Sequence, residues 1–182
     1  MRYYFAVAND ISSISPDQLG NAKLLTVDAE NVLTDYGNPI LREEALPILE
    51  SWESMEPGRR LAIATNNTDR DFIEELSGQL PEEILVFSGL GYASKKKSSE
   101  MFLAACEALS EHPSRAVHID DQRLSHRGAK LAGFAGGVLV KPYGQDGHRG
   151  VAAFRLFDQV CRGIYKSTNA ARSVYTDGLF SS

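Results

Sequence analysis

The segment Leu24-Leu25-Thr26-Val27-Asp28-Ala29-Glu30 decides the fold of this chain, because it joins an apolar run directly to two acids. The run 24–27 is apolar and partly β-branched, which is typical of a strand buried on both faces. In an open α/β sheet, residues that follow the carboxyl ends of the strands line the crevice where ligands bind. We therefore expect a buried strand at 24–27 that presents Asp28 and Glu30 to one site.

Length and composition limit the classes of protein to consider. A chain of 182 residues with 43% hydrophobic composition is expected to bury one core as one domain. The net charge of -5 disfavours nucleic-acid binding driven by overall charge. Cys106 and Cys161 lack CxxC spacing and lie in apolar surroundings, which favours buried free thiols in a reducing compartment. The apolar run at the N-terminus is too short for a signal peptide or membrane span, so we expect a cytoplasmic protein.

Further apolar runs alternate with helical patterns along the chain. Strands are predicted at 61–64, 84–87, 116–119 and 137–140, with a short lead-in strand at 3–7. Helices are predicted at 43–55, 69–80, 98–112, 127–134 and 151–165. This alternation predicts a mostly parallel, five-stranded sheet covered by helices on both faces. Residues 1–166 are expected to form one domain, and 167–182 a polar tail in which Val174 and Tyr175 could dock.

Groups suited to phosphoryl transfer follow the predicted strands 24–27 and 61–64. Asp28 is the candidate nucleophile, because a carboxylate can attack phosphorus and form an acyl phosphate. Glu30 is the candidate acid that protonates the leaving oxygen and later helps to deprotonate water. Thr65 offers a hydroxyl to the phosphoryl oxygens, and the backbone amides of Asn66 and Asn67 are expected to bind the same oxygens at the start of the next helix.

Two later segments add a cation and a metal ligand. Lys96 precedes a predicted helix and is expected to neutralise charge on the phosphoryl oxygens. Asp121 follows the strand 116–119 and would complete a Mg²⁺ site with Asp28, with Asp120 as a further candidate ligand. Each group also has an ordinary structural explanation, such as a helix cap or a solvated loop. Their order and their shared position after buried strands favour a site.

These residues resemble the haloacid dehalogenase (HAD) superfamily of phosphatases. The resemblance lies in Asp28-x-Glu30, Thr65-Asn66-Asn67, a lysine before a helix and Asp120-Asp121, in that order. Residues 14–16, 34–36, 65–67 and 121–124 fit more narrowly the YqeG-like branch, which includes phosphatidylglycerophosphate phosphatases. The resemblance covers the chain to about residue 165. It implies a three-layer, Rossmann-like HAD fold, and the short loops after the first and third strands leave little or no room for a cap domain.

The resemblance also implies an activity. A Mg²⁺-dependent phosphomonoesterase would work through an aspartyl-phosphate, with Asp28 and Asp121 as metal ligands and Glu30 contributing its backbone carbonyl. The family lysine falls on Lys96, with Lys95 and Lys97 as alternatives one residue away. An open site would accept a phosphorylated small molecule or a lipid headgroup, phosphatidylglycerophosphate among them.

Several departures from the family pattern keep a second function open. The family usually has aspartate at the position of Glu30, threonine at Val32, proline at Lys97 and often aspartate at His126. Glutamate is one methylene longer, and misplacing a proton donor by about 1 Å can cost on the order of a hundredfold in rate. The alternative is therefore a catalytically weakened, HAD-like phosphate-binding or scaffold protein.

A response-regulator receiver is disfavoured by the order of the groups. A receiver has its acidic pair at the first strand and its lysine at the last, whereas here the pair Asp120-Asp121 follows the lysine. His118 is expected to pack in the core, and His126 is expected at the surface rather than beside the metal ligands. A stripe of Arg155, Asp158, Arg162 and Lys166 leaves peripheral membrane contact open, although packing of that helix on the sheet is favoured.

Overall fold

A parallel sheet of seven strands forms the centre of the computed structural model, which describes residues 3–54, 58–92, 95–141 and 172–175. The strand order is β4-β3-β2-β5-β6-β1-β7, and every pairing between neighbours is parallel. The strands are β1 (Tyr4–Ala8), β2 (Leu24–Val27), β3 (Arg60–Ala64), β4 (Leu85–Phe87), β5 (Ala116–Asp120), β6 (Gly136–Val140) and β7 (Arg172–Tyr175).

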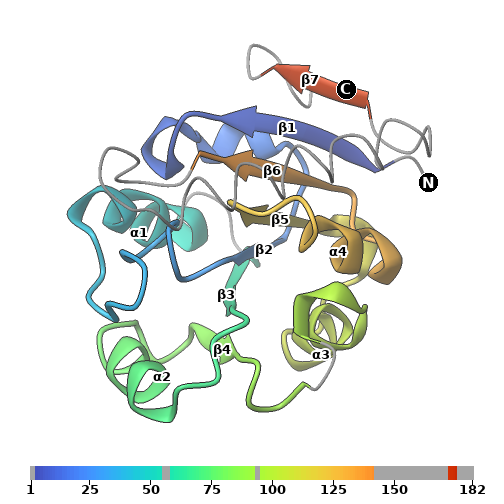
Figure 1. Cartoon of the computed structure of the whole chain (residues 1–182). Helices are drawn as coiled ribbons and strands as arrows, with labels where there is room; N and C mark the ends of the chain where they lie inside the picture. Colours follow the sequence, from blue (N-terminus) through green and yellow to red (C-terminus); the bar gives the residue numbers. More distant parts are fainter. Residues whose placement is uncertain (1–2, 55–57, 93–94, 142–171, 176–182) are drawn as a thin grey trace.

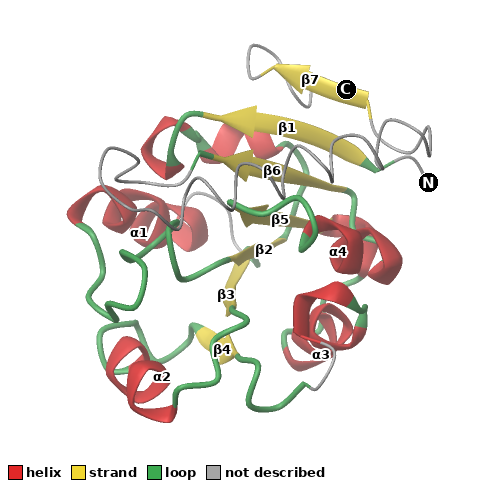
Figure 2. Cartoon of the chain, viewed as in Figure 1, coloured by secondary structure: helices red, strands yellow, loops and turns green. Residues whose placement is uncertain are grey.

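Helices cover both faces of this sheet (Figure 1). α1 (Leu46–Ser54) and α2 (Arg70–Ser77) lie on one face, and α3 (Glu100–Ala108) and α4 (His126–Ala132) lie on the other (Figure 2). Short 3₁₀ turns occur at Ile11–Ser13, Pro16–Leu19, Glu43–Ala45, Lys95–Lys97 and Pro113–Arg115. The predicted α/β fold with a mostly parallel sheet and helices on both faces is therefore confirmed.

The sheet is wider than the five strands that the sequence predicts. β1 pairs with β6 through the register Tyr4↔Gly136, and β7 pairs with the far side of β1. Gly136 permits this close approach, because a Cβ there would lie only 2.8 Å from the carbonyl oxygen of Tyr4. β7 falls within the segment predicted as a tail, where Val174 and Tyr175 were the residues expected to dock. The count of five was wrong because the lead-in strand β1 joins the sheet, and because β7 carries no apolar run of the kind that marks a buried strand.

Two apolar clusters form the core, one on each face of the sheet. Trp52, Phe72 and Leu76 from α1 and α2 belong to one cluster, and Phe102 and Ala129 from α3 and α4 belong to the other. All four residues of β2 are buried, as expected for a central strand in a two-sided sheet. This burial fixes the end of β2, and therefore Asp28, inside the molecule.

The helices are shorter than their sequence patterns. The predicted helix 43–55 begins as a 3₁₀ turn and becomes α1 only at Leu46, with Pro47 in its first turn, where its missing N–H costs no hydrogen bond. α2 begins after Asp69, whose carboxylate accepts from the backbone N–H groups of Asp71 and Phe72 at 3.0 and 3.4 Å. The predicted helix 151–165 lies outside the described residues.

Cys106 is a buried free thiol, as predicted, whereas Cys161 lies outside the described residues. Within the described part of the chain, no helix has the length and apolar character needed to cross a membrane.

Candidate functional site

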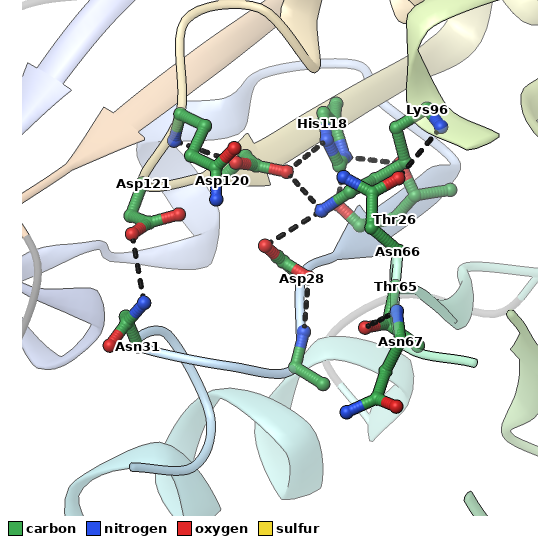
Figure 3. A network of polar contacts seen from close by, with 12 residues as sticks. Thr26, Asp28, Asn31, Thr65, Asn66, Asn67, Lys96, His118, Asp120 and Asp121 are labelled. Atoms are coloured by element: carbon green, nitrogen blue, oxygen red, sulfur yellow. Dashed lines mark hydrogen bonds and ion pairs between the residues drawn. The ribbon is translucent and has the colours of Figure 1, made fainter. Parts of the chain in front are cut away.

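The carboxyl ends of three adjacent strands bring three of the predicted site residues to one edge of the sheet. β3, β2 and β5 are neighbours in the sheet, and their ends lead into Thr65, Asp28 and Asp121. β2 and β5 are in register at Val27↔Ile119, and the Asp28 backbone N–H donates to the Ile119 carbonyl at 2.9 Å. The residues around 28 and 121 are therefore held side by side (Figure 3).

Asp28 is buried at the centre of this site, with 4% of its surface exposed. Its Oδ1 accepts from the backbone N–H of Ala29 at 2.8 Å, and its Oδ2 lies 2.7 Å from Lys96 Nζ. These contacts fix the carboxylate at the end of β2.

Lys96 is the lysine that reaches Asp28. Its side chain is fully buried, and Nζ lies 2.7 Å from Asp28 Oδ2 and 2.5 Å from Asp120 Oδ2. Its backbone N–H donates to Asn66 Oδ1 at 2.9 Å, which ties the 3₁₀ turn 95–97 to the loop after β3. The neighbouring Lys97 is exposed.

The adjacent residues Asp120 and Asp121 have different partners. Both oxygens of Asp120 are engaged, Oδ1 by the backbone N–H of Gln122 at 2.7 Å and Oδ2 by Lys96 and by His118 Nε2 at 3.0 Å. Asp121 Oδ2 accepts from Asn31 Nδ2 at 3.1 Å. Asp121 Oδ1 is buried and has no hydrogen-bond partner among the described residues.

This set of acids fits a hard divalent cation. Asp28, Asp120 and Asp121 each offer a carboxylate oxygen, and the three oxygens lie within 4.8 Å of one another. Carboxylates are the ligands that Mg²⁺ prefers, and a buried oxygen without a donor is the atom for which a cation would compensate. Asp121 Oδ1, which has no partner among the described residues, is the oxygen that most needs a cation, whereas Asp28 and Asp120 each have both oxygens engaged.

The buried acids perturb one another's ionisation. Burial, together with the charge of Asp120, raises the pKa of Asp28 to about 7, although Lys96 opposes the shift. Burial and the charges of Asp120 and Asp28 raise the pKa of Asp121 well above its usual range. Burial alone would raise the pKa of Asp120 as well, but the charge of Lys96 and the hydrogen bond from His118 hold it below its usual range.

Lys96 stays charged in this environment. Burial alone would lower the pKa of Lys96, but the carboxylates of Asp120 and Asp28 raise it. The site without a metal therefore holds one ionised pair, Lys96 with Asp120. The other two acids, Asp28 and Asp121, have raised pKa values, and a bound cation would stabilise their ionised forms.

The loop after β3 is held by hydrogen bonds among its own residues and to the turn 95–97. Thr65 is buried, and its Oγ1 accepts from the Asn67 backbone N–H at 3.2 Å. Asn66 Oδ1 holds the backbone of Lys96, and Asn67 Oδ1 accepts from Asp69 N–H at 2.7 Å. The Asn67 amide predicted for the phosphoryl oxygens is therefore used inside the loop, and the helix begins only at Arg70, because Asp69 supplies the cap.

The Glu30 side chain is not brought to the carboxylate cluster. It is partly exposed, and its Oε1 accepts from the backbone N–H of Gly37 at 3.0 Å. The chain turns back directly after β2, where the Ala29 carbonyl accepts from the N–H groups of Leu33 and Thr34 at 2.8 and 2.9 Å. This turn directs Glu30 toward the loop at Gly37, so its carboxylate is not among the three that form the cluster.

The two histidines near the site are both buried. His118 is in the core, as predicted, but it is also hydrogen-bonded to Asp120, a contact that the apolar pattern of β5 did not reveal. The predicted surface position of His126 is wrong, because its ring is fully buried between Phe5 and His118 and Nδ1 lies 3.1 Å from the Tyr3 hydroxyl. β1 lies next to β6 and so brings Tyr3 over the start of α4, which no local pattern could indicate.

The fold has known relatives, although no family model and no curated protein match the sequence. A structure from Mesorhizobium loti assigned to the HAD-like phosphatases is 18% identical, covers 70% of this chain and 74% of its own, and has a TM-score of 0.54. A predicted HAD-like family hydrolase from Porphyromonas gingivalis is 13% identical, with 76% and 98% covered and a TM-score of 0.50.

CbbY from Rhodobacter sphaeroides in complex with phosphate is 29% identical over 59% of this chain, with a TM-score of 0.47. The chain matches about half of the length of CbbY, 49%. The M. loti and P. gingivalis structures show that the chain has the HAD-like fold.

Proposed function

We propose that this chain is a Mg²⁺-dependent HAD-type phosphatase that hydrolyses phosphate monoesters through an aspartyl-phosphate on Asp28. The observation that carries the proposal is the buried Asp28 carboxylate, which is paired with Lys96 at 2.7 Å and clustered with Asp121. Asp121 Oδ1 is buried and has no partner among the described residues. The HAD-like fold supports the same conclusion.

The chemistry follows from the groups around Asp28. A carboxylate oxygen of Asp28 attacks phosphorus, the bond from phosphorus to the ester oxygen breaks, and the leaving oxygen takes up a proton. Water then attacks phosphorus of the aspartyl-phosphate, which releases inorganic phosphate and restores Asp28. Lys96 offsets the negative charge of the phosphoryl oxygens, and the Thr65 hydroxyl donates a hydrogen bond to one of them.

Asp28, Asp121 and the backbone carbonyl of Glu30 are the groups proposed to hold Mg²⁺. The bound ion would neutralise the charge of the phosphoryl group and of the buried acids. Glu30 is the proposed proton donor, and to act it must release the Gly37 N–H that it now accepts from. The protonation step is therefore coupled to movement of the Glu30 side chain.

The substrate is proposed to be a phosphorylated small molecule or a lipid headgroup. Exposed lysines such as Lys97 and Lys141 suit an anionic substrate. Phosphatidylglycerophosphate is the specific candidate that the sequence resemblance to the YqeG-like branch suggests. A cytoplasmic location and peripheral membrane contact stay predictions from the sequence.

Hydrolysis of p-nitrophenyl phosphate tests the proposal most simply. We expect turnover by the wild-type chain with Mg²⁺, and loss of turnover after chelation by EDTA and in Asp28→Asn. Asp35→Asn, which removes an exposed aspartate from the nearby loop, is the matched control and should keep wild-type turnover.

Two other outcomes have defined meanings. If the wild-type chain binds inorganic phosphate but hydrolyses no ester, and Glu30→Asp gains activity, the chain is the catalytically weakened phosphate-binding protein. If Asp28→Asn hydrolyses the ester as fast as the wild type, the aspartyl-phosphate mechanism is wrong.

A further inference from the structure

A continuous line of buried polar groups connects strand β2 to the site through strand β5. Thr26 Oγ1 lies 3.0 Å from His118 Nδ1, and His118 Nε2 lies 3.0 Å from Asp120 Oδ2 (Figure 3). Asp120 Oδ2 lies 2.5 Å from Lys96 Nζ, which in turn lies 2.7 Å from Asp28 Oδ2. Asp28 is 4% exposed and the other members are fully buried.

The hydrogens along this line can be assigned from its chemistry. An ionised carboxylate only accepts hydrogen bonds, so His118 Nε2 carries the hydrogen that lies toward Asp120. Nδ1 of the neutral ring then accepts from the Thr26 hydroxyl, which lies closer to Nδ1, at 3.0 Å, than to its other acceptor, the Val117 carbonyl oxygen, at 3.4 Å. Nδ1 also lies 3.1 Å from the Thr26 carbonyl oxygen. Thr26 and Asp120 thus hold opposite sides of the ring and keep the hydrogen on Nε2.

Neighbouring aromatic rings prevent the His118 ring from turning. Phe102 contacts it edge-on, with ring centroids 4.8 Å apart, and the His126 ring lies 5.2 Å away. The N–H of Nε2 is therefore a fixed donor, unlike a water molecule or a flexible side chain.

Asp120 needs such a donor because it determines where Lys96 stands. A lysine has a flexible stem and a point charge, so the position of Nζ depends on the acceptors around it. Without the His118 donor, Asp120 Oδ2 would be held by Lys96 alone. The carboxylate, anchored only through Oδ1 to the Gln122 backbone N–H, could then rotate with the lysine instead of fixing it.

We infer that His118 is a positioning residue for the phosphatase site, which holds Asp120 so that Lys96 stays aligned with Asp28. The inference rests on the proposed function. It divides the adjacent aspartates between two tasks, with Asp121 facing the cation and Asp120 facing the lysine. In this proposal His118 acts only through Asp120, the side chain to which its Nε2 is hydrogen-bonded.

Two substitutions of His118 separate this role from packing. In His118→Gln, the side-chain amide nitrogen can occupy the place of Nε2 and donate to Asp120. In His118→Asn, the shorter amide can serve Thr26 but leaves Asp120 without that donor. Ile119→Val is the matched control, because it removes a buried methylene from the same strand on the opposite face.

We expect His118→Asn to lower kcat on p-nitrophenyl phosphate by on the order of ten- to a hundredfold, because Lys96 loses its alignment. His118→Gln should restore kcat to within a few-fold of wild type. Calorimetric titration should give the same Mg²⁺ affinity for wild type, His118→Asn and His118→Gln, because Asp121 and Asp28 are unchanged. Binding of inorganic phosphate with Mg²⁺ present should weaken in His118→Asn alone.

Thr26→Val keeps the test valid if His118→Asn does not fold. It removes the hydroxyl that serves Nδ1 while keeping a β-branched residue in β2, and it should lower kcat several-fold without loss of Mg²⁺ affinity. The inference is overturned if His118→Asn or Thr26→Val keeps wild-type kcat and phosphate affinity. It is also overturned if His118→Gln and His118→Asn lose activity equally. A wild-type chain that neither hydrolyses the ester nor binds phosphate would instead overturn the proposed function, and the inference with it.

Discussion

Substituting alanine for Gly128 should displace Lys96, although Gly128 has no part in the proposed chemistry. Gly128 lies in α4, where that helix touches the 3₁₀ turn 95–97. A Cβ on Gly128 would overlap the carbonyl oxygens of Lys96 and Ser98 and would lie 2.8 Å from Phe102 Cε2. Backbone atoms on the turn cannot swing aside as a side chain could, so either the turn or α4 must move.

The size of the effect follows from this overlap. Ordinary contact begins near 3.4 Å, so the turn and α4 must separate by roughly 1 Å, and a misplacement of Lys96 by that distance can cost about a hundredfold in rate. Lys96 Nζ now lies 2.7 Å from Asp28 Oδ2, a contact that a shift of this size would break. Overpacking of a buried position also costs about 1–3 kcal/mol of unfolding free energy.

Three measurements on Gly128→Ala test the argument. We expect kcat on p-nitrophenyl phosphate to fall by about a hundredfold, with Tm lowered and Mg²⁺ affinity unchanged. Gly78→Ala is the matched control, because a Cβ there meets Glu74 O and Glu75 O at ordinary distances of 3.5 and 3.6 Å. The reasoning is refuted if Gly128→Ala folds and turns over substrate as fast as Gly78→Ala does.

Three further predictions concern the acids. Asp121→Asn should weaken Mg²⁺ binding at least tenfold by calorimetry, since one carboxylate ligand is lost; an unchanged affinity would exclude Asp121 as a ligand. Mg²⁺ affinity should rise as pH increases from 5 to about 7 and then level off, because the cation displaces the proton of Asp28, whose pKa is raised to about 7; a flat profile would contradict this shift. Between pH 4 and 7 the folded state keeps a proton on Asp28 that the unfolded state has lost, so raising the pH destabilises the metal-free chain. Asp28→Asn removes this effect. In urea unfolding without metal, the free energy of unfolding of Asp28→Asn minus that of wild type should therefore increase by about 1 kcal/mol for each pH unit from 4 to 7. A difference that does not change with pH would contradict the prediction.

The sequence was sufficient for the architecture because the buried strands are marked by their composition. The run 24–27 and its counterparts are apolar on both faces, and the polar residues at their ends fall at one edge of a parallel sheet. β1 and β7 were harder to place, because their pairing depends on which edge of the sheet remains open. That edge is set by the whole topology.

The direction of side chains after a strand end was the part that local pattern could not supply. Glu30 follows Asp28 by two residues, yet the turn after β2 directs its carboxylate to Gly37 N–H. The hydrogen bond between His118 and Asp120 could have been predicted from the sequence, because β5 extends to Asp120 and residues two apart on a strand share a face. His118 and Asp120 are such a pair. The contact of Tyr3 with His126, by contrast, joins residues 123 positions apart and follows only from the pairing of β1 with β6.

Chemical trapping of the covalent intermediate tests the central claim most directly. Borohydride reduces an acyl phosphate to an alcohol, so quenching the reaction during turnover with Mg²⁺ should convert residue 28 to homoserine, detectable by mass spectrometry of the peptide. We predict homoserine at position 28 only when substrate and Mg²⁺ are both present, and none in Asp28→Asn. Sustained turnover with reduction at another carboxylate, or with none at all, would contradict the account.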